Sequence, residues 1–213
     1  NALAAVGAAF PAMFLAMSVL IGITMGVQII ISPLFGAGEH ERMRATFATS
    51  MISLIIMVAI ASVIGHFASG SILGLMNTPP EIIADSEAYL DEIFKGLIFM
   101  FLYNLYTSVL RGVGDSKTPL YFLIISSILN IVLDLVYVVQ FGLGVRGVAI
   151  ATVQSQAVSA VLCIIYTNIR IPLFRLGLRD LRVDFDILKT ILRFGIPTAI
   201  QQSIVSLGMM SVQ

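Results

Sequence analysis

Long runs without charged residues dominate the pattern of the chain. No Asp, Glu, Lys or Arg occurs between residues 1 and 38 or between residues 45 and 80. A bilayer core about 30 Å thick is crossed by about 20 apolar residues in a helix. The first run therefore predicts a membrane-spanning helix over residues 10–32. The second predicts another from residue 45 to residue 64 or beyond.

Four further apolar segments continue this pattern. They predict spans over residues 89–110, 119–141, 147–169 and 194 to the end of the chain. The third span carries three charges in its interfacial turns, Asp91, Glu92 and Lys95. The fourth contains one charge, Asp134. The pattern as a whole predicts an all-α, polytopic bundle of transmembrane helices.

Composition agrees with this prediction and narrows the class of protein. Hydrophobic residues make up 58% of the 213 residues and charged residues 11%, against about 25% charged residues in ordinary soluble domains. The formal net charge of zero argues against a nucleic-acid partner, because such a partner requires a basic excess. The single cysteine, Cys163, excludes an internal disulfide. The expected surroundings are a lipid bilayer.

The basic residues predict the orientation of the chain. Ten of the twelve Lys and Arg residues lie on one side of the predicted membrane, around Arg42, around Arg111 and between residues 170 and 193. Only Lys95 and Arg146 lie on the other side. Because cytoplasmic loops carry the positive excess, the three basic segments are predicted to be cytoplasmic. We expect a multi-pass protein of the inner (plasma) membrane.

The polar stretch over residues 170–193 is expected to link two halves of a bundle. Within it, Asp186 is expected to cap a short amphipathic helix that runs to Phe194. Thr118 is expected to cap the fourth span in a similar way. The first residue is not an initiator methionine and the last lies in an apolar stretch. We therefore interpret the sequence as a fragment of a longer protein, with one helix preceding it.

Asp134 is the most informative residue, because a carboxylate at the centre of a membrane helix costs at least about 2.5–3.5 kcal/mol. Asn130, Ser127 and Tyr137 share its side of the helix. At about 1.5 Å per residue, Asp134 and Thr152 lie at a similar depth below the outer surface. A carboxylate, an amide and a hydroxyl at one level can hold a proton, or a Na⁺ ion through oxygen ligands. The alternative is that Asp134 and Asn130 only join two helices by hydrogen bonds.

Other residues support weaker hypotheses. Gly22 and Gly26 form a GxxxG pattern, which is typical of close helix packing. Four glutamines either line a polar cavity or bond to neighbouring helices: Gln154, Gln156, Gln201 and Gln202. The two histidines stand apart and lack the partners of a metal motif. We therefore predict no catalytic residue and no metal site apart from Na⁺ at the three residues around Asp134.

Four segments in one order, ALAAVG, RGVGDSKTP, NIVLD and FGLGVRGVAIAT, resemble the multidrug and toxic compound extrusion (MATE) family of secondary transporters. The resemblance runs from residue 2 to the end of the chain. It implies a twelve-helix fold of two six-helix lobes. Residues 1–169 would be helices two to six of the first lobe, residues 170–193 the cytoplasmic linker between lobes, and residues 194–213 the start of helix seven.

The resemblance also implies roles for individual residues. Members of the family hold a cation with an Asn and an Asp four residues apart and a Thr eighteen residues further on, and Asn130, Asp134 and Thr152 match this spacing. A Tyr and an Asn of the preceding helix complete the network in the family. The resemblance assigns these two positions to Tyr89 and Asn104.

These implications predict a cation-coupled antiporter that exports drugs or other organic compounds by alternating access. The coupling ion would be H⁺ or Na⁺, with no other cofactor, and the substrate a small amphipathic or cationic organic compound carried by a monomer. Val205 stands where one branch of the family has a Glu, so coupling is expected to depend on the first lobe. One alternative is a lipid or glycolipid flippase, which would need a basic groove. The other is a membrane enzyme, but no enzymatic motif is visible and we expect no enzymatic activity.

Overall fold

The computed structural model of the protein describes residues 2–75, 78–177, 180 and 182–211. Every regular element in these residues is a helix, which confirms the all-α prediction. The elements are α1 (Ala2–Gly36), α2 (His40–Leu75), α3 (Pro80–Gly112), α4 (Lys117–Asp134), the π-helix η1 (Leu135–Gln140), α5 (Gly144–Arg170), the short helix η2 (Pro172–Phe174) and α6 (Phe185–Ser211).

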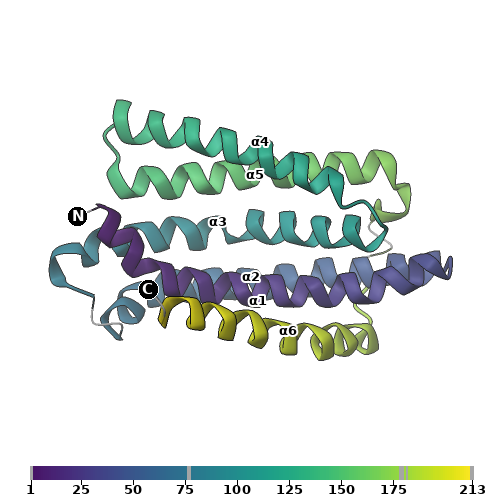
Figure 1. The fold of residues 1–213 in the computed structure, drawn as a ribbon. Helices are drawn as coiled ribbons and strands as arrows, with labels where there is room; N and C mark the ends of the chain where they lie inside the picture. Colours follow the sequence, from purple (N-terminus) through teal and green to yellow (C-terminus); the bar gives the residue numbers. More distant parts are fainter. Residues whose placement is uncertain (1, 76–77, 178–179, 181, 212–213) are drawn as a thin grey trace.

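The long helices lie side by side in an elongated bundle (Figure 1). α3 runs through its middle and contacts α1, α2 and α5. α6 packs along α1, and α4 packs mainly on α5. The side chains of α3 are largely buried, whereas those of α4 are exposed along most of the helix. α4 is therefore the outermost helix on its side of the bundle.

Five helices are long and apolar enough to cross a membrane in the part of the chain that the structure describes. They cover Ala16–Gly36, His40–Gly74, Pro80–Gly112, Lys117–Gln140 and Gly144–Arg170. The first five predicted spans are thereby confirmed. α6 is not among the five, and the sixth predicted span runs into residues 212 and 213, which lie outside the described residues.

α3 begins at Pro80, well before the start predicted near Tyr89. Pro79 has an extended backbone conformation with ψ 139°. Pro80 takes one of the first helical positions, where the missing N–H leaves no bond unmade. The prediction relied on hydropathy, and the acidic residues that follow Pro80 kept this segment from resembling a membrane helix. The first turns of α3 are therefore expected to lie outside the apolar core of the membrane.

α6 begins at Phe185 and continues without a break past Phe194, where the amphipathic helix was expected to end. Asp184, and not Asp186 as predicted, caps this helix. The Asp184 Oδ1 atom accepts hydrogen bonds from the backbone N–H groups of Asp186 and Ile187, at 2.9 and 3.1 Å. The sequence offers two aspartates in front of the same apolar run, and spacing alone does not distinguish them.

Close packing of α1 against α6 depends on two glycines. A Cβ atom on Gly22 would lie 2.4 Å from the Cα atom of Ala199. A Cβ atom on Gly26 would lie 2.7 Å from the carbonyl oxygen of Ile191. Backbone atoms cannot move away as a flexible side chain can, so both positions require glycine. The GxxxG pattern therefore serves helix packing, as the sequence indicated.

The basic segments of the chain gather at one end of the bundle (Figure 1). The turn between α1 and α2 and the loop between α3 and α4 close this end, and α5 ends and α6 begins there. The connections from α2 to α3 and from α4 to α5 lie at the opposite end. This arrangement agrees with the grouping of Lys and Arg from which the orientation was predicted.

Cysteine labelling tests this orientation in the whole protein. Cys163 is buried, and Cys163→Ala gives a background without thiols in this chain. Glu81→Cys lies at the exposed start of α3 and should react with a membrane-impermeant maleimide added outside the cell. Arg42→Cys lies at the exposed start of α2 and should react only after the membrane is permeabilised. The reverse pattern would invert the predicted orientation.

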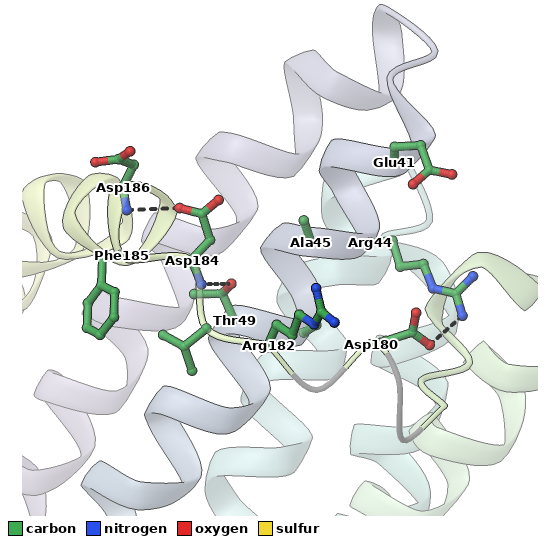
Figure 2. A pocket seen from close by; sticks show the side chains of 11 residues that line it. Glu41, Arg44, Ala45, Thr49, Asp180, Arg182, Asp184, Phe185 and Asp186 are labelled. Carbon is green, nitrogen blue, oxygen red and sulfur yellow. Dashed lines mark hydrogen bonds and ion pairs between the residues drawn. The ribbon is translucent and has the colours of Figure 1, made fainter.

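Residues just before α6 are hydrogen-bonded to α2 around a cavity of about 600 Å³, at the end of the bundle where the basic segments gather (Figure 2). The Arg44 Nη2 atom donates a hydrogen bond to Asp180 Oδ2 at 2.6 Å, and the backbone N–H of Asp184 donates one to Thr49 Oγ1 at 3.1 Å. The N–H of Gly177 and the Arg44 guanidinium hold the pKa of Asp180 below its ordinary value. Asp180 thus stays ionised and keeps its link to α2 at neutral pH.

Candidate cation site

The loop before α4 fixes where this helix starts. The Asp115 carboxylate accepts a hydrogen bond from the backbone N–H of Thr118 at 3.0 Å and one from the hydroxyl of Tyr166 on α5 at 3.1 Å. Burial opposes ionisation here, but these hydrogen bonds hold the pKa of Asp115 below its ordinary value. Asp115, and not Thr118 as predicted, therefore caps α4 by accepting a hydrogen bond from a backbone N–H of its first turn, and it also joins this helix to α5.

Two further hydrogen bonds hold α4 against α5 nearer the middle of the membrane. The Ser126 hydroxyl donates to the carbonyl oxygen of Ser155 at 3.0 Å. The Ser159 hydroxyl donates to the carbonyl oxygen of Phe122 at 3.1 Å. Each bond joins a short side chain to the backbone of the other helix, so the two helices approach closely. Together they set the register of α4 on α5.

Asn130 and Asp134 each keep a buried polar atom without a hydrogen-bond partner among the described residues. These atoms are Asn130 Nδ2 and Asp134 Oδ1, on side chains that are otherwise half-buried. A buried polar atom left unpaired costs about 1–3 kcal/mol, and more when it is charged. The Asp134 oxygen can take a proton or a cation, whereas the Asn130 Nδ2 atom is a donor and needs an acceptor.

Thr152 contributes a hydroxyl from α5. Its Oγ1 atom donates to the carbonyl oxygen of Val148, one turn earlier, at 2.9 Å. This bond uses the hydroxyl proton, while the oxygen keeps lone pairs that can accept a hydrogen bond or bind a cation. One branch of the MATE family has a Glu at the position of Val205. The side chain of Val205 lies outside the described part of the structure.

The two assigned residues of α3 lie far apart along that helix. Tyr89 is 4% exposed, and its hydroxyl contacts the sulfur atom of Met13 on α1 at 3.5 Å. Asn104 lies fifteen residues further on, about 22 Å along a helix, and its Nδ2 atom donates to the carbonyl oxygen of Met100 at 2.8 Å. Tyr89 thus lies in the half of α3 that starts at Pro80, and Asn104 in the half that ends at Gly112.

The polar stripe predicted on α4 is only partly continuous. Ser127 is exposed and donates to the carbonyl oxygen of Leu123 in its own helix. At the other end, η1 follows Asp134 directly, and the Tyr137 hydroxyl donates to Gln154 Oε1 on α5 at 2.7 Å. The sequence carries no recognisable signal for a π-helical segment, so the turn of Tyr137 toward α5 was missed.

The charges that interrupt the third span form ion pairs in the half of the bundle away from the basic segments. Asp91 contacts His66 of α2 and, at 2.6 Å, Lys95 of its own helix. Glu92 contacts Arg146 of α5 at 2.8 Å. These pairs join α2, α3 and α5. No group of three His, Cys, Asp or Glu side chains among the described residues could hold a metal ion.

Apolar spanning helices, one of which carries the carboxylate of Asp134, identify the chain as part of a polytopic helical membrane protein. Residues 1–136 match the family model MatE. The chain therefore belongs to the multidrug and toxic compound extrusion (MATE) family, which confirms the family predicted from its motifs.

Individual relatives extend the match over the whole chain. The probable multidrug resistance protein YoeA of Bacillus subtilis is 38% identical over 219 residues, which cover 100% of this chain and 47% of the relative. The probable multidrug resistance protein NorM of Thermotoga maritima is 29% identical, over 99% of this chain and 46% of the relative. A solved MATE family transporter in an inward-facing conformation is 28% identical, with a TM-score of 0.90 over 98% of this chain and 48% of the other. The chain spans about half the length of these relatives.

Proposed function

We propose that the whole protein is a cation-coupled antiporter of the plasma membrane that exports small organic compounds by alternating access. Asp134 is the residue that binds H⁺ or Na⁺ in this proposal. The observation that carries it is the unpartnered buried Oδ1 atom of Asp134. Ionisable residues inside membrane helices mark ion pathways more often than they serve packing.

The three polar residues can each take part in ion exchange. Bound H⁺ would neutralise Asp134 and turn one of its oxygens into a donor. Bound Na⁺ would take oxygen ligands from Asp134, Asn130 and Thr152, the ligand type that hard cations prefer. Either ion gives Asp134 a partner that the described residues do not supply. Release of the ion when access alternates between the two sides would couple the gradient to export.

A small apolar cavity supports an amphipathic organic substrate over a lipid headgroup. The cavity of about 330 Å³ lies between α1, α2 and α3, and its lining includes Leu20, Met57 and Phe94. No Lys or Arg is among the described residues that line it, whereas a flippase would need a basic groove for its anionic cargo. Both named bacterial relatives are described as probable multidrug resistance proteins, which supports the same substrate class.

Dye export by the whole protein in proteoliposomes tests this function. When an inward gradient of H⁺ or of Na⁺ is imposed, a fluorescent organic cation such as ethidium should move outward, opposite to the ion. Its movement should stop when an ionophore collapses that gradient. Empty liposomes give the background rate. Transport at an unchanged rate with both gradients collapsed would contradict cation coupling.

Thr152→Val should weaken cation binding without abolishing transport. The change removes one oxygen ligand and leaves the charge of Asp134, so we expect the cation concentration for half-maximal export to rise about three- to ten-fold. Thr190→Val is the matched control, because the Thr190 hydroxyl also bonds to its own helix but lies on α6. An unchanged half-maximal concentration in Thr152→Val would remove Thr152 from the site.

A further inference from the structure

The helix that carries Asp134 changes its winding directly after this residue. It is α-helical from Lys117 to Asp134 and π-helical from Leu135 to Gln140. The N–H of Phe141 accordingly bonds to the carbonyl oxygen of Val136, five residues back, where an α-helix would reach four residues back. Single π-helical turns occur frequently at functional sites.

The wider winding turns Tyr137 onto α5. In a regular α-helix, a spacing of three residues would place Tyr137 on the side of Asp134. In the structure, the Tyr137 hydroxyl instead donates to Gln154 Oε1 at 2.7 Å. A Cβ atom on Gly147 would approach the Cβ atom of Tyr137 to 3.0 Å. The absence of a side chain at Gly147 therefore lets Tyr137 pack directly on α5.

Gln154 cannot share the ion with Thr152. The two residues are two positions apart on α5, which is about 200° around a helix of 3.6 residues per turn. Their side chains therefore leave α5 on nearly opposite sides. The bond between Tyr137 and Gln154 thus joins α4 to α5 on the side of their interface that faces away from Thr152.

This bond lies where α4 has little other support. The remaining side-chain hydrogen bonds between the two helices in the described chain start from Ser126 and Ser159, and both lie on the inner side of Asp134. The link through Asp115 lies further inward still. α4 makes few contacts with helices other than α5. Among the described residues, the half of α4 that carries Asp134 is therefore tied to α5 by a side-chain hydrogen bond only through Tyr137 of η1, which follows it directly.

We propose that Tyr137 and Gln154 are positioning residues of the cation site. Their hydrogen bond holds the end of α4 that carries Asp134 against α5, the helix that carries Thr152. The inference rests on the proposed function, because it assumes that a cation binds at Asp134. It adds two residues and one structural element, η1, to the site.

Cation dependence of export by the whole protein in proteoliposomes tests this role. Tyr137→Phe removes only the hydroxyl, and we expect the cation concentration for half-maximal ethidium export to rise about three- to ten-fold. The maximal rate should stay near that of the unmodified protein, because all ion ligands remain. Tyr121→Phe is the matched control, since Tyr121 is 60% exposed on the same helix, and it should change neither quantity.

Gln154→Met tests the same bond from the other helix with a side chain of similar length. It should raise the half-maximal concentration as Tyr137→Phe does. The double variant should have the same half-maximal cation concentration as either single variant, because both substitutions remove the same hydrogen bond. Additive losses, or an unchanged cation dependence in both single variants, would overturn the inference.

If Asp134→Asn retains coupled export, the proposed function itself fails. If Asp134→Asn loses coupling while both single variants behave as the unmodified protein, only this inference fails.

Discussion

Asp134→Asn is expected to lower gradient-driven export by the whole protein to background while folding and membrane insertion survive. Asn has nearly the shape of Asp and keeps an oxygen acceptor, but it cannot bind a proton reversibly or supply a negative charge to Na⁺. The variant would then lack the carboxylate oxygen that we propose binds the ion, the Oδ1 atom that is unpartnered in the structure. Ethidium uptake into everted vesicles, driven in turn by H⁺ and by Na⁺, measures the effect.

Ser127→Ala is the control for Asp134→Asn. Ser127 lies on the same helix, but it is exposed and bonds to its own backbone at Leu123, so its loss should leave export unchanged. If Asp134 only ties helices together, an Asn at this position would still offer an oxygen acceptor and an amide donor to a neighbouring helix. Export at nearly the original rate in Asp134→Asn would then support that structural role and refute the ion-binding one.

Gly22→Leu is expected to prevent α1 from packing on α6. Even a single added Cβ would lie 2.4 Å from the backbone of Ala199, and Leu adds three more carbon atoms at this contact. Overpacking costs about 1–3 kcal/mol where side chains can adjust, and more is expected where backbone must move. The whole protein should lose its monodisperse peak in size-exclusion chromatography, or melt at a clearly lower temperature in detergent.

Gly7→Leu separates the packing effect from the general cost of replacing glycine in a helix. Gly7 lies on the same helix, and nothing in the structure lies within 4 Å of a Cβ atom placed there. This variant should elute and melt as the unmodified protein does. Equal stability of Gly22→Leu and Gly7→Leu would show that the close contact between α1 and α6 is not needed.

Hydropathy was sufficient to predict the spanning helices because charge-free runs of this length rarely occur in a folded protein except as membrane helices. It was not sufficient for their ends. α3 extends back to Pro80 because an acidic segment outside the membrane can continue a helix that hydropathy assigns only to the apolar core. The cap of α6 fell on Asp184, since two nearby aspartates satisfy the same sequence rule.

The candidate site was predictable to the extent that it depends on helical spacing. Asn130 and Asp134 are four residues apart and share a buried side of α4, as any α-helix would require. Tyr137 departs from this stripe because the helix widens at η1. Helix winding there depends on contacts with α5, which local sequence does not specify. The position of Tyr89 relative to Asp134 depends in the same way on how α3 packs.

Reversed coupling tests the central claim most directly. Whole protein is reconstituted in liposomes with an ethidium gradient and no initial gradient of H⁺ or Na⁺. If export and cation movement are obligatorily exchanged at Asp134, ethidium moving downhill should drive one of the two ions in the opposite direction, as seen with internal indicator dyes. Asp134→Asn should abolish this ion movement. Downhill ethidium movement that drives neither ion in the unmodified protein, or ion movement that persists in Asp134→Asn, would contradict the account.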